Sequence, residues 1–218
     1  MRRLVDLCCA VAGALVIALV VVAPGYAAGP WFGGQVGNAT QVISVVGTGG
    51  SNATVDLWQR GPAGWAPVGA GIPAKVGGQG ISRNTFEGSG ATPMGIFTLN
   101  SAFGTKPNPG SGLPYVQVGP QHWWVGDVNS PLYNTMAVCA PADCPFSTAA
   151  PTENLDIPVY AQAVVMGVNA ARTPGKGSAF FLHDTDGGPT AGCVAIDPGM
   201  LTKIIGWLRP GALIAISK

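Results

Sequence analysis

Residues 178–196 read SAFFLHDTDGGPTAGCVAI, which is two apolar runs joined by a loop rich in Gly, Pro and Asp. The first run is apolar on both of its faces and predicts a buried central strand. The second run, at 194–196, predicts another buried segment, and the loop between the runs is long enough to fold back. We therefore expect His183, where the first strand ends, and Cys193, where the second segment starts, to come into contact.

Similar short runs, apolar or β-branched and separated by Gly, Pro, Asn and Ser, continue on both sides of this stretch. They predict strands at 41–46, 54–60, 65–68, 96–99, 115–118, 121–125, 159–168, 178–183 and 212–217. Asp197 followed by Pro198 predicts the start of a helix, because apolar residues then recur at helical spacing as far as Leu208. The sequence therefore predicts a mainly β fold with one short helix after the cysteine loop.

Composition supports a folded chain and excludes some kinds of partner. Gly and Pro make up 52 of 218 residues (33 plus 19), but the 47% apolar content favours a packed, turn-rich β protein over disorder. The length suits one domain. A net charge of +1 and the lack of a basic run give no reason to expect a nucleic acid or a lipid surface as partner.

The N-terminus predicts export. Two arginines precede an apolar run over 7–23, and small residues follow it at a suitable cleavage position. We therefore expect a signal peptide over 1–27 and a secreted or cell-envelope protein. An uncleaved membrane anchor is the alternative, because the run is only slightly shorter than a spanning helix. We expect a loose N-terminal arm at 28–40, followed by the catalytic domain at 41–218.

Three cysteines remain after such cleavage, namely Cys139, Cys144 and Cys193. An exported protein reaches an oxidising compartment, where an odd number of cysteines leaves one without a partner in the chain. Cys139 and Cys144 can close a small loop, which would stabilise the fold by about 2 kcal/mol and leave Cys193 free. The alternative is that Cys193 pairs with one of them, since the sequence does not decide the connectivity.

A free thiol beside a histidine indicates nucleophilic catalysis. A thiol with an ordinary pKa is only slightly ionised at neutral pH and needs a base, for which His183 is the candidate. The backbone N–H groups of Gly192 and Cys193 are candidate oxyanion donors. Glycines such as Gly188 allow the backbone to approach a substrate closely.

Other polar residues near these positions have simpler interpretations. Asp184 and Asp186 could orient His183, but they are typical turn residues. His122 has aromatic neighbours and is interpreted as structural or as part of the cleft wall. A protein-built zinc site is poorly supported by two histidines and one free cysteine, and no cofactor is expected.

Several motifs in the same order resemble the secreted L,D-transpeptidases of peptidoglycan, with the YkuD-type catalytic domain, in an actinobacterial-looking version. The motifs are ATPMGIFTL at 91–99, HWWVGDVNSPLYN at 122–134, Glu153 with Leu155, GKGSAFFLH at 175–183, TAGCVAI at 190–196 and IIGWLRPG at 204–211. The resemblance implies a β-sandwich-like fold that acts on peptide stems of the cell wall. It assigns the nucleophile to Cys193 and the base to His183.

The resemblance also implies a reaction. The Cys193 thiolate attacks the carbonyl between the L-centre of diaminopimelate and the terminal D-alanine, and D-alanine leaves. An amine of a neighbouring stem then gives a crosslink, whereas water gives carboxypeptidase activity. Carbapenem-type β-lactams are expected to acylate the same sulfur. The expected substrate-binding residues are Thr190, Gly188, Trp123 and Arg83.

The chain departs from the common family pattern at three positions near the cysteine. Asp184, Ala191 and Ala195 stand where a glycine, a second histidine and an arginine are usual. Arg83, Lys106 or Lys176 could supply the missing charge for a substrate carboxylate.

Two alternatives remain open. The first is a catalytically weak or inactive peptidoglycan-binding module of the same fold. The second is a sortase-like transpeptidase, which would use His122, Cys193 and Arg209 in that order.

Overall fold

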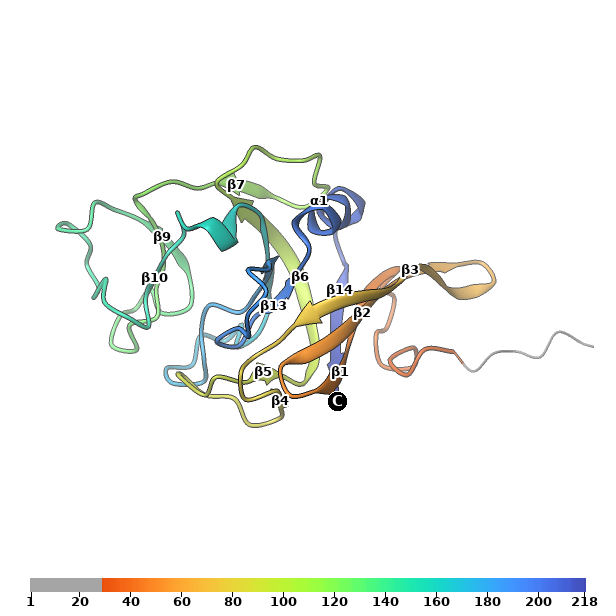
Figure 1. The fold of residues 1–218 in the computed structure, drawn as a ribbon. Coiled ribbons are helices and arrows are strands. Elements are labelled where there is room, and N and C mark those ends of the chain that lie inside the picture. Colours follow the sequence, from red (N-terminus) through yellow and green to blue (C-terminus); the bar gives the residue numbers. More distant parts are fainter. Residues whose placement is uncertain (1–28) are drawn as a thin grey trace, which may run out of the picture.

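The computed structural model describes residues 29–218 (Figure 1). The predicted signal peptide, residues 1–27, lies outside the described residues. Within residues 29–218, no helix is both long and apolar enough to cross a membrane.

One large mixed sheet organises the fold (Figure 1). Its end strand β11 pairs not only with β12 but also with β6, so the sheet closes on itself. In spatial order the strands are β11 (Ala163–Met166), β12 (Phe181–Asp184), β13 (Val194–Ile196), β3 (Gly64–Lys75), β2 (Asn52–Gly61), β1 (Gln41–Gly49), β14 (Leu213–Ser217), β6 (Gly95–Gly104) and β7 (Tyr115–Gln117). The closed sheet has an inner face that holds the core and an outer face that can carry a site.

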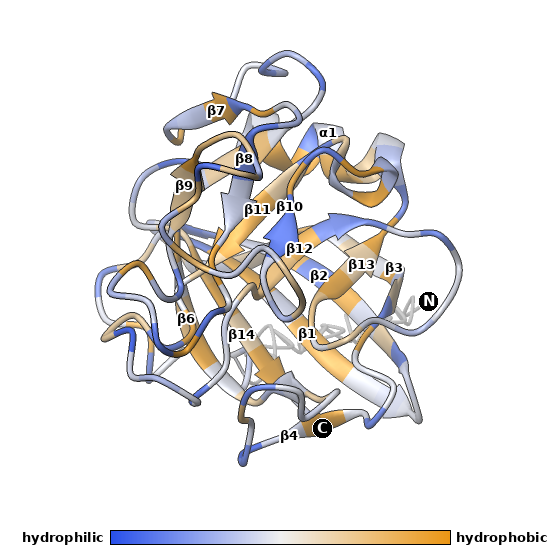
Figure 2. Cartoon of the chain, turned by 90° about the vertical axis from the view of Figure 1, so that its left-hand side faces the viewer, coloured by the Kyte–Doolittle hydropathy of each residue, from blue (hydrophilic) through white to orange (hydrophobic). Residues whose placement is uncertain are grey.

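The core fills the closed sheet and extends to α1 (Pro198–Trp207). This is the single α-helix within the described residues. Alternation along the strands points side chains such as Val55 and Leu182 inward, and the strands β6, β11 and β14 are mainly orange in Figure 2. Asp197 begins the helix by accepting a hydrogen bond from the N–H of Met200, 2.9 Å away. The predicted mainly β fold with one short C-terminal helix is confirmed.

A smaller unit covers the outer face of β11 and β12. It contains a three-stranded sheet and a 3-10 turn at Pro158–Tyr160. Trp124 packs edge-on against Phe181 with ring centroids 5.0 Å apart. The three strands are β8 (His122–Trp124), β9 (Met136–Val138) and β10 (Glu153–Asn154), and a separate pair joins β4 (Ile81–Ser82) to β5 (Thr92–Pro93). The space between this unit and the large sheet contains the candidate site.

Two strands begin several residues later in the structure than the sequence predicts. The predicted strand over 159–168 is wrong in its first half, because Pro158 starts a 3-10 turn and β11 begins only at Ala163. The strand predicted over 178–183 begins at Phe181, because Ala179 adopts a left-handed φ of 56° that interrupts an extended chain.

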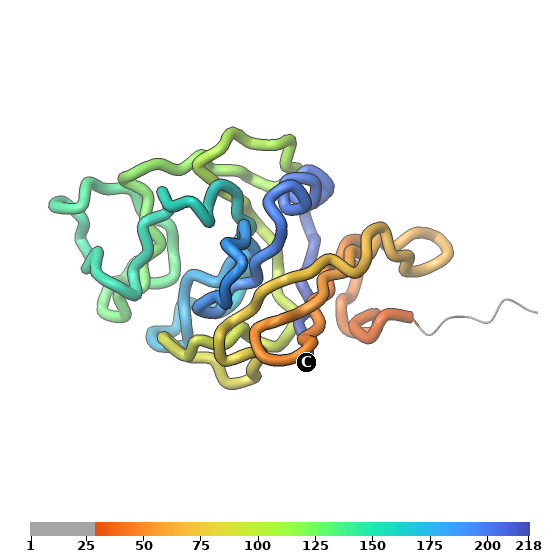
Figure 3. Tube along the Cα trace, viewed as in Figure 1, coloured from red at the N-terminus to blue at the C-terminus, as the bar shows by residue number. Residues whose placement is uncertain are grey.

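The N-terminal segment, predicted as a loose arm at 28–40, is packed against the fold over residues 29–40. Phe32 is fully buried and packs edge-on against Trp58 and Trp65, at centroid distances of 5.9 and 5.4 Å. Figure 3 shows this segment, in red, close to the hairpin of β2 and β3. The expectation was wrong because the aromatic partners of Phe32 lie more than twenty residues further along the chain.

Candidate active site

Cys193 and His183 lie on the same outer face of the large sheet. Strands β12 and β13 run parallel, with Leu182 opposite Val194 and His183 opposite Ala195. Leu182 and Val194 point into the core, so the alternate residues Cys193 and His183 point outward. Both line one pocket of about 390 Å³.

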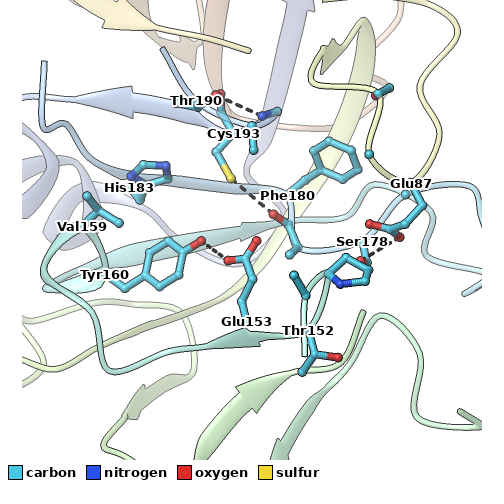
Figure 4. Close-up of a pocket in the computed structure, with 18 of the residues that line it drawn as sticks. Glu87, Thr152, Glu153, Val159, Tyr160, Ser178, Phe180, His183, Thr190 and Cys193 are labelled. Carbon is cyan, nitrogen blue, oxygen red and sulfur yellow. Dashed lines mark hydrogen bonds between the residues drawn. The ribbon is translucent and has the colours of Figure 1, made fainter. Parts of the chain in front are cut away.

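The Cys193 thiol is held by the backbone rather than by the histidine. Its sulfur donates a hydrogen bond to the oxygen of Ala179 at 3.3 Å (Figure 4). It also accepts one from the N–H of Phe181 at 3.3 Å. Burial and then the charge of Glu153 raise the pKa of Cys193, and the Phe181 N–H opposes them. The site therefore holds a protonated thiol.

His183 is present as a neutral base. Its Nδ1 lies 2.8 Å from the backbone oxygen of Asp184, and a carbonyl only accepts, so Nδ1 carries the hydrogen. The lone pair is consequently on Nε2. Burial lowers the pKa of His183, against the raising effects of the Asp184 carbonyl and the Asp186 charge. No hydrogen bond joins His183 to Cys193 within the described residues, so the expected contact is limited to a shared pocket.

A tyrosine and a glutamate stand beside this pair. The Tyr160 ring lies edge-on to His183, with centroids 5.4 Å apart. The hydroxyl of Tyr160 donates a hydrogen bond to Glu153 (Figure 4), and Glu153 lines the same pocket as Cys193. Burial raises the pKa of Glu153, whereas the bond from Tyr160 lowers it. The sequence did not predict Tyr160 as a site residue. Glu153 was named only as one of the motifs that resemble the L,D-transpeptidases.

A second glutamate fixes the opposite side of the pocket. Glu87 accepts hydrogen bonds from the hydroxyls of Tyr133, at 2.5 Å, and Ser178, at 2.9 Å. Desolvation, followed by the bond to Glu87 and its charge, raises the pKa of Tyr133 to about 12. The hydroxyl is therefore a permanent donor, and it ties the loop that carries Glu87 to the rest of the site.

Two threonines anchor the backbone of the cysteine. Thr190 and Thr92 both donate to the Cys193 oxygen, at 2.6 and 3.1 Å. The Thr190 oxygen also accepts from the N–H of Gly192 at 3.1 Å, so one predicted oxyanion donor is already engaged. The N–H of Cys193 has no acceptor among the described residues and remains available. Thr92 was missed by sequence reasoning, since it lies 101 residues from its partner.

The predicted substrate-binding residues separate into two groups. Thr190 lines the pocket, but Gly188, Trp123 and Arg83 do not. Trp123 is 8% exposed and donates from Nε1 to the oxygen of Cys139, so it belongs to the packing of the smaller unit. Its neighbour Trp124 points the other way, because successive residues of a strand face opposite sides.

The residues expected to supply positive charge are also elsewhere. No Lys or Arg of the described chain lines the pocket, including Arg83, Lys106 and Lys176. Its charged lining consists of Glu87, Glu153 and Asp186. The pocket is therefore acidic.

The arrangement expected of a sortase-like site is not assembled. His122 accepts from the N–H of Gly119 at 3.1 Å, and Arg209 donates to the oxygens of Gly206 and Leu208. Neither His122 nor Arg209 lines the pocket of Cys193.

The cysteine pairing agrees with the first of the two predicted connectivities. Cys139 and Cys144 form a disulfide with their Cα atoms 5.3 Å apart, and Cys193 is a free, buried cysteine. Over the described part of the chain, no group of three or more His, Cys, Asp or Glu side chains is arranged to hold a metal ion.

One comparison with known proteins identifies a family. Residues 51–216 match the family model described as YkuD, L,D-transpeptidase catalytic domain. Among solved structures, the chain is similar to the crystal structure of L,D-transpeptidase 1 from Mycobacterium tuberculosis, with 14% identity and a TM-score of 0.35. That match covers 82% of this chain and 63% of the other, so the chain spans less than two thirds of its length. No curated protein matches the chain.

Proposed function

Because the chain belongs to the YkuD family of L,D-transpeptidase catalytic domains, we propose that it is a cysteine acyltransferase acting on peptidoglycan stem peptides. The observation that carries the proposal is the free Cys193 in one pocket with a His183 whose Nε2 lone pair is available. A nucleophile and a neutral base on one face are what acyl transfer through sulfur requires.

The first half of the reaction forms a thioester. The Cys193 side chain leaves the Ala179 oxygen, passes its proton to His183 Nε2 and bonds to the carbonyl carbon that precedes the terminal D-alanine. The free N–H of Cys193 stabilises the oxyanion. The carbon–nitrogen bond then breaks, and the departing amine takes the proton from His183.

The second half transfers the acyl group. An amine of a second stem attacks the thioester, its proton passes through His183 to the sulfur, and the carbon–sulfur bond breaks. The product is a crosslink, or a shortened stem if water attacks instead. The same sulfur would open the ring of a carbapenem-type β-lactam and retain it as an ester of the thiol.

We propose that this activity lies outside the cytoplasm, on the basis of the predicted signal peptide over 1–27. The disulfide of Cys139 and Cys144 is compatible with such a compartment. Export is tested by sequencing the N-terminus of the protein recovered from the cell envelope or medium. We expect it to begin directly after residue 27.

The activity is tested by incubating the mature protein with a tetrapeptide stem that ends in D-alanine. We expect release of D-alanine, and an acyl adduct on the intact protein by mass spectrometry. Cys193→Ala should abolish both. His183→Ala should also lose turnover, whereas the matched control His122→Ala should retain it, because His122 lies outside the pocket.

The reverse pattern for the two histidines would favour sortase-like chemistry. Stem binding by the wild-type protein without release or adduct would instead indicate a non-catalytic module of the same fold.

A further inference from the structure

The side chain of Asn134 spends its whole hydrogen-bonding capacity on three separate segments of the fold. Its Oδ1 accepts from Nε1 of Trp124 at 2.9 Å and from the backbone N–H of Ala179 at 3.4 Å. Its Nδ2 donates to the backbone oxygens of Val168 and Asn169, at 3.2 and 3.1 Å. A side-chain amide has two N–H donors and an oxygen with two lone pairs, so all four positions are filled.

One of these partners also holds the nucleophile. The N–H of Ala179 donates to Asn134, and the oxygen of the same residue accepts from the Cys193 sulfur, 3.3 Å away. Asn134 itself does not line the pocket. It is therefore one residue removed from the reacting atom, with Ala179 as the link.

The backbone of Ala179 depends on contacts of this kind. Its φ of 56° is left-handed, which is disfavoured for a residue with a Cβ and persists only where neighbouring groups hold it. Ala179 precedes β12 and has no strand pairing of its own. The other partner of the sulfur, Phe181, lies in β12 and pairs with Val165 of β11. Loss of the Asn134 contact should therefore release the oxygen of Ala179 but leave the N–H of Phe181 in place.

We propose that Asn134 is a positioning residue for the nucleophile, which fixes the resting place of the Cys193 sulfur through the left-handed Ala179. The inference rests on the proposed acyl transfer for its effect on turnover, but not for its effect on the thiol. Asparagine suits this role, because it tolerates its own left-handed φ of 56° and supplies both donors and acceptors. An ionised aspartate would have no donor for the two backbone oxygens.

Removal of Asn134 should change the thiol in one direction. The oxygen of Ala179 stabilises the protonated sulfur, whereas the N–H of Phe181 stabilises the thiolate. Losing the first and keeping the second lowers the pKa of Cys193 from its raised value. Turnover should nevertheless fall, because a sulfur that is no longer held meets the substrate carbonyl less often in a productive position.

The test compares Asn134→Gly with Asn169→Gly. Both asparagines are half-buried and left-handed, with φ of 56° and 50°, so glycine fits either backbone. The Asn169 side chain makes three hydrogen bonds, to the N–H and the oxygen of Thr173 and to the oxygen of Gly177, but none to Ala179. It is therefore a matched control for the loss of a well-bonded side-chain amide.

The quantities measured are the pH profile of Cys193 alkylation by iodoacetamide, and kcat and KM for D-alanine release. Asn134→Gly should lower the midpoint pH of alkylation and reduce kcat at least about tenfold. KM should change little, since Asn134 lies outside the pocket. Asn169→Gly should keep the wild-type midpoint and kcat. The ionisable groups that line the pocket around the thiol are unchanged in both variants, and they are Glu87, Glu153, Tyr160, His183 and Asp186.

A second measurement uses the wild-type protein and does not depend on how well Asn134→Gly folds. Hydrogen exchange followed by NMR should show the N–H of Ala179 exchanging at least about tenfold more slowly than that of Ala191. Ala191 is exposed, and its N–H has no acceptor among the described residues. Equal exchange rates would show that Asn134 does not hold Ala179, and would overturn the inference.

The outcomes separate this inference from the proposed function. Equal midpoints and equal kcat values in the two glycine variants would leave Asn134 with a purely structural role and overturn the inference. D-alanine release by the wild-type protein would then still support the proposed activity. A midpoint lowered in Asn134→Gly alone, with no D-alanine release by the wild-type protein, supports the inference and contradicts the proposed activity.

Discussion

The Cys193 sulfur donates a hydrogen bond to the backbone oxygen of Ala179, 3.3 Å away. A carbonyl oxygen only accepts, so this contact exists only while the thiol keeps its proton. Ala179 presents its oxygen from a left-handed conformation, with a φ of 56°, that few non-glycine residues adopt. The backbone before β12 is therefore shaped to hold the nucleophile in its resting form.

The first prediction concerns the ionisation of this thiol. Alkylation of native Cys193 by iodoacetamide should be slow at neutral pH and half-maximal above about pH 9, because burial raises its pKa above the ordinary thiol value. Glu153→Gln should accelerate alkylation at pH 8 by removing a nearby negative charge. Mass spectrometry across pH gives the profile, with Asp156→Asn and the unfolded protein as controls. A native midpoint below that of the unfolded protein would contradict the resting state described above.

A second prediction concerns the glycine before the nucleophile. Gly192 has a φ of 155°, and a Cβ built there would lie 2.8 Å from the ring of Phe180. Gly192→Ala should reduce the free energy of unfolding by about 1–3 kcal/mol and lower activity. Gly188→Ala is the control, since its Cβ would meet nothing closer than 3.4 Å. Urea unfolding curves should separate the two variants, and equal stabilities would count against the argument.

Thr92 provides a third prediction. This fully buried hydroxyl accepts from the N–H of Gly77 at 2.8 Å and donates to the oxygen of Cys193 at 3.1 Å. Thr92→Val keeps the shape but leaves the Gly77 N–H unpaired, so the free energy of unfolding should fall by about 1–3 kcal/mol. Thr48→Val, at an exposed position, should change it little. Thermal unfolding compares the pair, and a neutral Thr92→Val would show that the hydroxyl is dispensable.

The N-terminal segment gives a fourth prediction. Phe32 is fully buried among aromatic side chains, whereas its neighbour Trp31 is 44% exposed. Phe32→Ala should therefore reduce the free energy of unfolding by about 3–5 kcal/mol, and Trp31→Ala by much less. Denaturant unfolding of the two variants measures this difference. Similar small effects would restore the interpretation of this segment as a loose arm.

The sequence predicted those strands, the helix start and the disulfide that depend on residues close together in the chain. Apolar or β-branched runs bounded by turn residues located β1 and β2, and the Asp197–Pro198 pair located the helix start. The spacing of Cys139 and Cys144 predicted their disulfide. The loop between His183 and Cys193 predicted that the two would come into contact, and the structure brings them into one pocket without a hydrogen bond between them.

Contacts between distant segments were not predictable in this way. Trp123 and Trp124 are adjacent and chemically identical, yet only Trp124 packs against Phe181 beside the site. Which of them faces the large sheet depends on how β8 is placed over it. Tyr160 and Thr92 likewise join the site through contacts with elements far away in the chain.

The sequence by itself left the disulfide connectivity open, but it determined the mainly β architecture, the C-terminal helix and the candidate pair of Cys193 with His183. These follow from periodicity, capping and spacing, which act over a few residues. Only the tertiary structure decided the protonation of the thiol and the acidic character of the pocket. A pKa depends on desolvation and on neighbouring charges in space, and the charge that raises the pKa of the Cys193 thiol after burial belongs to Glu153, from another part of the fold.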